Sequence, residues 1–172
     1  DRDRLAPPPP PRPIENERAL VDYINDLNRE WVRLARRYSA RVLTDLYASL
    51  SRDLAAFFEQ VPLDGPALFG VSWAGEMNSL AWFDIGREFT EHWHHQAQIR
   101  DAAGAPAASN PAWLHAVLAI AMRGLPHTYR NVLAADGSTL VVDITGPSGG
   151  TWMLRRDGDR WMVIEGGAAQ HP

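Results

Sequence analysis

Three of the six histidines stand close together in residues 84–102, beside two glutamates. We expect this stretch to form one helix, on which residues four apart lie above one another on the same face. Glu91 and His95 form one such pair, and Glu88 and His92 form another. A carboxylate oxygen and an imidazole nitrogen at this spacing can reach one divalent cation. Either pair could therefore supply two ligands of a mixed nitrogen and oxygen metal site.

The same face also has an interpretation without a metal. On a solvated helix, Glu and His four residues apart stabilise the helix by only about 0.2–0.5 kcal/mol per pair. A Glu-x-x-x-His pattern is short and recurs by chance. Spacing alone therefore leaves both interpretations open, and it assigns no third ligand.

Composition narrows the classes of function. The chain has 172 residues, of which 45% are hydrophobic, which predicts one or two domains with a real core. The net charge of −4, without a basic run, argues against nucleic acid and anionic membranes as partners. Cysteine is absent, which excludes disulfides, thiolate ligands and a cysteine nucleophile. No apolar run approaches the roughly 20 residues that span a bilayer, and no signal peptide is recognisable, so we expect a cytoplasmic location.

The elements that position these residues follow from periodicity. Apolar spacing predicts a helix over residues 14–37 and a second one capped by Ser39. Because only two or three residues join these helices, we expect them to pack antiparallel. A loop rich in proline and glycine follows over residues 61–83. Asp84 is then the expected cap of the histidine-rich helix, which we expect to end at Gly104.

Downstream the pattern changes from helix to strand. Asn110 and Pro111 open another helix, which we expect to reach about Arg123. Residues 139–145 and 151–155 are typical of strands, and Asp157-Gly158 marks a tight turn to a third strand, so we expect a β-meander.

Helices followed by strands indicate an α+β chain with two domains. We predict a helical bundle over residues 1–104 and a small α+β domain over residues 110–172, with the boundary near 104–110.

Four segments resemble a known family. The segments Val71-Ser-Trp-Ala-Gly-Glu76 and Trp82-Phe-Asp-Ile-Gly-Arg-Glu-Phe-Thr-Glu-His-Trp-His-His-Gln-Ala-Gln-Ile-Arg-Asp-Ala102 resemble the mycothiol-dependent maleylpyruvate isomerase-like branch of the DinB superfamily. Gly124-Leu-Pro-His-Thr-Tyr-Arg130 and Gly149-Gly-Thr-Trp-Met-Leu-Arg155 resemble the small C-terminal domain of that family. The resemblance covers nearly the whole chain, and its motif at 82–102 is far more specific than a bare Glu-x-x-x-His.

The resemblance implies a fold with a metal inside it. Relatives have an up-down-down-up four-helix bundle that holds one divalent metal, often zinc. The first ligand in relatives is a histidine on an early helix. By comparison with relatives, we expect that helix to end before Asp1, where this sequence begins. We therefore expect a fragment: a DinB-like antiparallel bundle that lacks its first helix, followed by an incomplete α+β domain.

The resemblance also implies roles for particular residues. Glu91 and His95 match the ligand pair of the later helix, with Glu88 and His92 as the register alternative. Gln98 or Glu88 would orient the ligands, and Arg100 could receive a substrate carboxylate. The third metal ligand is not evident in this chain, and no catalytic residue is assigned.

The implied function is a metal-dependent thiol transferase or isomerase. Its cofactor would be a divalent metal, with zinc as the first candidate. Its partners would be a low-molecular-weight thiol such as mycothiol and an electrophilic small-molecule substrate, and an oligomer is compatible with the sequence. The alternatives are a non-catalytic module that binds a metal or small ligand, and a degenerate fragment without independent activity.

Overall fold

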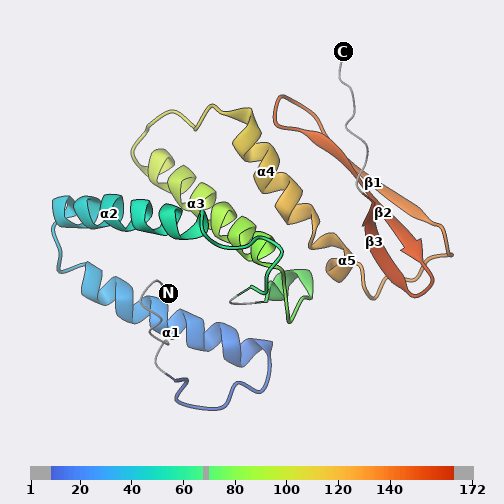
Figure 1. Ribbon diagram of the computed structural model, residues 1–172, viewed down its shortest axis with the longest axis horizontal. Helices are drawn as coiled ribbons and strands as arrows, with labels where there is room; N and C mark the ends of the chain where they lie inside the picture. The colour runs from blue at the N-terminus through green and yellow to red at the C-terminus, as the bar shows by residue number, and fades with distance from the viewer. Residues whose placement is uncertain (1–8, 68–69, 165–172) are drawn as a thin grey trace. The chain divides into compact units, whose positions relative to one another are not determined.

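Helices come first along the chain and strands follow, as Figure 1 shows. The computed structural model describes residues 9–67 and 70–164, and the other residues of the two predicted domains lie outside the described part. Within it, α-helices and one short 3-10 helix precede a three-stranded antiparallel sheet. The chain is therefore of the mixed α+β class that the order of predicted elements indicated. None of the helices in these ranges is long and apolar enough to cross a membrane.

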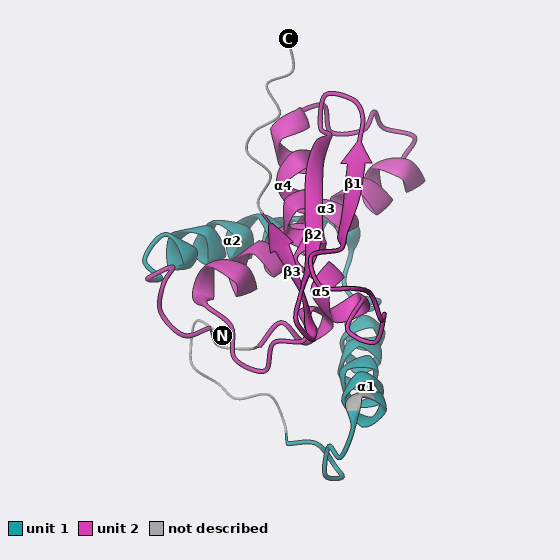
Figure 2. Cartoon of the chain, turned by 90° about the vertical axis from the view of Figure 1, so that its right-hand side faces the viewer, with its two compact units in different colours: residues 1–61 teal, residues 62–172 magenta. Residues whose placement is uncertain are grey.

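The chain divides into two compact units, Asp1–Val61 and Pro62–Pro172, which Figure 2 colours separately. In the first unit, helix α1 spans Glu17–Ala35 and helix α2 spans Ala40–Phe58. A polar side chain caps each helix. Asn16 Oδ1 accepts a first-turn N–H of α1 at 2.9 Å, and Ser39 Oγ accepts one of α2 at 3.3 Å. These bonds satisfy donors that have no partner inside the helix, and the predicted cap at Ser39 is confirmed.

Apolar side chains of α1 and α2 stay largely exposed. No residue of α2 is buried, and Trp31 and Tyr47 keep 54% and 63% of their surfaces exposed. The two helices share no extended interface. The predicted antiparallel packing of this pair is therefore not confirmed, because an apolar stripe predicts a helix without saying which surface covers it.

In the second unit, a loop with a short 3-10 helix, η1 (Ser72–Ala74), leads into helix α3, Ala81–Ala102. The prediction that Asp84 caps this helix is wrong, since the helix begins three residues earlier, after Leu80. Backbone carbonyls of the preceding loop take the place of a side-chain cap. Gly65 O accepts the N–H of Ala81 at 2.9 Å, and Leu63 O accepts that of the next residue at 3.0 Å. Asp84 lies in the first turn instead.

Helix α4, Pro111–Met122, and the one-turn helix α5, Leu125–Thr128, come next. Asn110 Oδ1 accepts a first-turn N–H of α4 at 3.0 Å, and proline occupies the first helical position, so the predicted start of this helix is confirmed. Helix α5 was not predicted from the sequence. It packs against η1 and against the third strand.

The sheet consists of β1 (Thr139–Ile144), β2 (Gly150–Asp157) and β3 (Arg160–Ile164), in that order and all antiparallel. These are the strands of the predicted β-meander. Asp157 pairs with Arg160, so the tight turn consists of Gly158 and Asp159, one residue later than predicted. Gly158 has a φ of 59°, a left-handed conformation that glycine adopts without strain.

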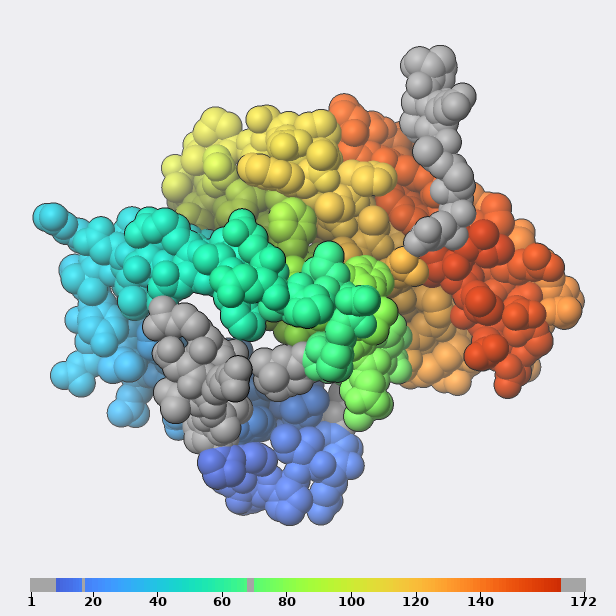
Figure 3. All heavy atoms as spheres, in the orientation of Figure 1, coloured from blue at the N-terminus to red at the C-terminus, as the bar shows by residue number. Residues whose placement is uncertain are grey.

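Helix α4 lies between α3 and the sheet, and in Figure 3 its atoms adjoin those of the strands. His115 of α4 stacks on Trp152 of β2 with ring centroids 5.7 Å apart. On its other side α4 approaches α3 closely, since a Cβ at Gly86 would lie only 2.5 Å from Cδ1 of Ile120. The buried apolar side chains of the described residues lie just before η1, at the start of α3 and in the sheet: Val71, Ala81, Phe83, Leu154 and Trp161.

The compact units do not divide at the predicted domain boundary near residues 104–110. Helix α3 precedes that boundary and α4 follows it, yet the two helices pack against each other within Pro62–Pro172. The physical reason is this shared interface, which joins α3 to the C-terminal part of the chain.

Candidate functional site

The candidate ligands lie on the C-terminal half of α3. The first turns of this helix are anchored, since Ala81 and Phe83 are buried. From residue 91 onward most side chains are exposed, including those of His92, His94 and His95. The partly buried N-terminal half of α3 therefore anchors the helix, and solutes have access to the side chains of its C-terminal half.

Glu91 and His95 face each other on this exposed half. Glu91 Oε2 lies 3.6 Å from His95 Nε2, and the two side chains keep 54% and 65% of their surfaces exposed. This separation is longer than a hydrogen bond, which spans about 2.7–3.2 Å. Two ligand atoms on a tetrahedral zinc, each about 2.0–2.1 Å from the metal, lie about 3.3 Å apart. The pair therefore fits a shared divalent cation after a shift of a few tenths of an ångström.

Gln98 holds the imidazole ring from its other side. Its Oε1 lies 2.9 Å from His95 Nδ1, and its Nε2 lies 3.1 Å from His94 Nε2. With the amide in this orientation its oxygen only accepts, so Nδ1 of His95 carries the hydrogen. In the neutral ring the lone pair is then on Nε2, the atom that faces Glu91. Gln98 therefore contacts the ring nitrogen that faces away from Glu91, and its role in orienting a metal ligand stays a prediction.

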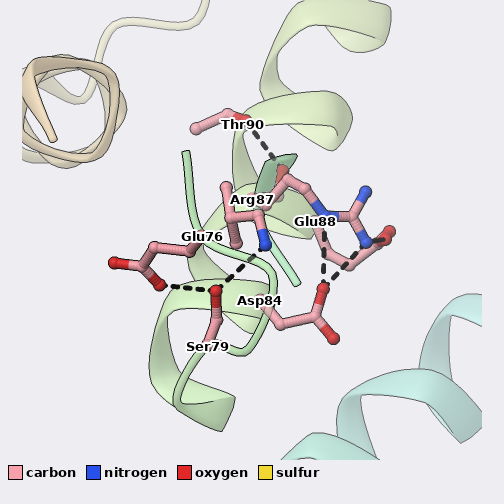
Figure 4. Close-up of polar contacts among 7 residues, drawn as sticks. Glu76, Ser79, Asp84, Arg87, Glu88 and Thr90 are labelled. Atoms are coloured by element: carbon pink, nitrogen blue, oxygen red, sulfur yellow. Dashed lines mark hydrogen bonds and ion pairs between the residues drawn. The ribbon is translucent and has the colours of Figure 1, made fainter. Parts of the chain in front are cut away.

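In the register alternative, Glu88 is engaged by Arg87, as Figure 4 shows. Nη2 of Arg87 lies 2.6 Å from Glu88 Oε1 and 2.9 Å from Asp84 Oδ1. No ion pair joins Glu88 to His92 within the described ranges. The structure therefore brings together the pair Glu91 and His95, but not the pair Glu88 and His92.

The cluster around Arg87 is partly buried, which affects its charge. Burial by itself would lower the pKa of Arg87, but the hydrogen bonds that Arg87 donates to Asp84 and the negative charges of Glu88 and Asp84 outweigh burial. The pKa of Arg87 is consequently raised above its ordinary value. The guanidinium of Arg87 stays charged and forms ion pairs with Asp84 and Glu88. Glu91, by contrast, faces a histidine.

The loop before α3 is fixed by its own polar contacts, also drawn in Figure 4. The backbone N–H of Val71 donates to Ser79 Oγ at 3.0 Å, and Ser79 Oγ donates to a carboxylate oxygen of Glu76. Ser79 is buried. These bonds hold the segment from which α3 starts, and so contribute to the position of the site.

Arg100 is engaged at the end of α3. Its Nε donates to Gln96 Oε1 at 2.8 Å, and its Nη1 donates to the carbonyl oxygen of Pro106 at 2.9 Å. The side chain therefore ties the last turns of the helix to the connection that follows. The expected contact with a substrate carboxylate stays a prediction.

Two other histidines have structural partners. His115 Nδ1 lies 2.9 Å from the carbonyl oxygen of Gly149, and the ring stacks on Trp152. The ring of His127 lies against Gly75, where a Cβ would come within 2.4 Å of Nδ1. Neither ring belongs to the site on α3.

The sequence analysis assigned no role to His94. Gln98 in fact bridges His94 and His95, whose ring centroids are 5.8 Å apart. The signal was available, because His94 and Gln98 are four residues apart. Over residues 9–67 and 70–164, no group of three or more His, Asp or Glu side chains is arranged to hold a metal ion.

Comparisons of this chain with protein-family models, curated proteins and solved structures found no match. The resemblance to the DinB superfamily therefore stays a prediction, and the functional argument depends on the geometry of α3.

Proposed function

We propose that α3 binds a divalent cation through Glu91 and His95, with zinc as the first candidate. One observation carries this proposal: Glu91 Oε2 and His95 Nε2 face each other at 3.6 Å while Gln98 engages the opposite nitrogen of the ring. A carboxylate oxygen and a neutral imidazole nitrogen are both ligands that zinc accepts. The exposed position of the pair leaves room for further ligands, which a catalytic metal site requires.

We further propose that the chain is a metal-dependent thiol transferase or isomerase, like the mycothiol-dependent maleylpyruvate isomerase-like proteins. The resemblance of residues 82–102 supports this class. The resemblance likewise supports the finer fold proposal, a DinB-like helical bundle with a small α+β domain. A zinc ion held there would lower the pKa of a small thiol and so favour the thiolate nucleophile at neutral pH. The chain has no cysteine, which agrees with a thiol that enters as a cosubstrate. A cytoplasmic setting fits, because small thiols are kept reduced there.

Different side chains of α3 would have different roles in the proposed site. Glu91 and His95 hold the cation. Gln98 keeps His95 in the tautomer whose Nε2 can coordinate the cation. Arg87 forms an ion pair with Glu88, so this carboxylate does not compete with Glu91 for the cation. Arg100 would have to exchange its bonds to Gln96 and Pro106 before it could receive a substrate carboxylate.

Metal content tests the cation site. The purified chain is loaded with zinc, dialysed and analysed for its elements, alongside Glu91→Gln, His95→Ala and Gln98→Ala. We expect bound zinc in the wild type and its loss in the first two variants. Gln98→Ala should weaken zinc binding about 10–100-fold, because it removes only the group that orients the ligand. His92→Ala is the matched control, and it should keep its zinc.

Two results would count against the assignment. Zinc lost in His92→Ala and retained in His95→Ala would favour the other register. No zinc retained by the wild type would mean that the two ligands on α3 do not suffice.

The second candidate function is a non-catalytic module that binds a metal or small ligand. It is favoured by the fact that the described ranges bring together only two candidate ligands. Cobalt substitution separates the two functions, since a thiolate that coordinates Co²⁺ adds a sulfur-to-metal charge-transfer band. We expect this band when free cysteine is added to the cobalt-loaded chain. Cobalt binding without the band would support the module.

A further inference from the structure

Arg156 is a buried cation that meets no anion among residues 9–67 and 70–164. Only 7% of its surface is exposed, and its Nε and Nη1 atoms are buried and make no hydrogen bond. No ion pair involves this residue within the described ranges. It stands near the end of β2, on the same face of the sheet as Leu154, which is fully buried.

A guanidinium in this situation is unusual in energetic terms. Moving a charge out of water is costly unless it is paired and hydrogen-bonded, so buried charges in proteins normally have partners. The aromatic ring of Trp161, 5.9 Å from Arg156 Cζ, compensates only part of this cost. The unpaired donors therefore indicate a position that an anion completes.

We propose that Arg156 anchors a binding site for a small organic carboxylate. The planar guanidinium presents paired donors that match the two oxygens of a carboxylate. One negative charge neutralises one guanidinium, whereas a phosphate brings more charge and a larger desolvation cost into the same apolar surroundings. The part of Arg156 that stays exposed is where the carboxylate approaches.

Trp161, the aromatic neighbour of Arg156, is itself held by further contacts. Trp161 pairs with Arg156 across the two strands, and its Nε1 donates to the carbonyl oxygen of Val132 at 3.0 Å. Tyr129 meets the same indole edge-to-face, with centroids 5.9 Å apart. Because the neighbouring ring of Trp161 is aromatic, a carboxylate with an apolar body suits this position better than a small hydrated ion.

This carboxylate site does not depend on the proposed cation site on α3. Thermal unfolding of the full chain tests it. Sodium benzoate, acetate and inorganic phosphate serve as probes, with sodium chloride keeping the ionic strength constant. We expect benzoate to raise the Tm of the wild type by about 5–10 °C at a hundredfold excess over its dissociation constant. Acetate should bind more weakly, because it lacks the apolar body, and phosphate should have less effect than benzoate.

Arg156→Met removes the charge at similar volume, and it should abolish the rise with benzoate. Arg155→Met is the matched control, because this neighbouring arginine points to the opposite, exposed face. The control should retain the full rise. Arg156→Lys keeps the charge without the fork, so benzoate should bind it at least about tenfold more weakly. This variant carries the test if Arg156→Met does not fold.

Two results would overturn the proposal. Equal benzoate dependence in the wild type and in the Arg156 variants would show that binding does not involve Arg156. A rise with phosphate that matches or exceeds the rise with benzoate would overturn the carboxylate assignment.

Discussion

Substitution of Gly86 by alanine tests how α3 is held against α4, on which the position of the candidate site depends. Gly86 is the only glycine of α3. A Cβ at this position would lie 2.5 Å from Cδ1 and 3.2 Å from Cγ1 of Ile120. The new methyl group therefore cannot fit unless the isoleucine side chain or one of the helices moves.

Two opposing effects set the magnitude. Alanine in place of glycine within a helix gains about 0.8–1 kcal/mol, whereas overpacking costs about 1–3 kcal/mol. We expect Gly86→Ala to lower the free energy of unfolding by about 1 kcal/mol. Ile120→Val removes Cδ1, and by itself it should cost about 0.5–1.5 kcal/mol.

The double variant is the informative one. Without Cδ1 the closest contact is removed, and the 3.2 Å contact to Cγ1 needs only a small adjustment. The helix-forming gain of alanine then offsets the loss at Ile120, so we expect the double variant to unfold within about 0.5 kcal/mol of the wild type. The two substitutions should thus couple favourably by about 1–2 kcal/mol.

Urea unfolding followed by circular dichroism at equal protein concentration gives all four free energies. Metal-free buffer with a chelator keeps any metal on α3 from contributing to stability. Additive effects of the two substitutions would refute the close approach of Gly86 to Ile120. A stabilised Gly86→Ala single variant would refute it as well.

Two further substitutions test other contacts of the second unit. Gly75→Ala should lower the free energy of unfolding by about 2–4 kcal/mol, because alanine is strained at a φ of 80° and its methyl group would meet the ring of His127 at 2.4 Å. Chemical unfolding measures this loss. Gly104→Ala is the control, since Gly104 has a φ of 62° and open space around it. Asn110→Ala removes the cap of α4 and should cost about 1 kcal/mol, whereas Asn110→Ser should restore most of the stability; a loss of less than about 0.3 kcal/mol would contradict the role of this cap.

Local signals in the sequence predicted much of the secondary structure. Ser39 and Asn110 begin helices because their side chains accept a first-turn N–H, which depends on neighbouring residues alone. The strands and the turn at Gly158 likewise follow from alternation and from the preference of glycine for positive φ. Helical spacing placed Glu91 with His95 and Glu88 with His92 equally, and only the structure shows that the first pair faces each other while Glu88 pairs with Arg87.

Features that depend on distant contacts were not predictable in this way. Asp84 was expected to cap α3, but carbonyls of Gly65 and Leu63 satisfy the first donors of the helix, and these residues lie far back in the loop. The burial of Arg156 was also missed. Alternation could have directed Arg156 inward and Arg155 outward, but only the three-dimensional contacts show that Nε and Nη1 of Arg156 meet no hydrogen-bond partner in the described part of the chain.

The order of the three strands has a consequence for how the sheet opens. Within the described ranges, β2 is hydrogen-bonded on both sides, whereas β1 and β3 each have one free edge. An edge strand can detach by breaking one ladder of hydrogen bonds, but β2 must break two. Local opening therefore begins at β1 or β3, and the amides of β2 exchange with solvent last among the strands. Since Arg156 lies on β2, its backbone belongs to the part of the sheet that opens least often.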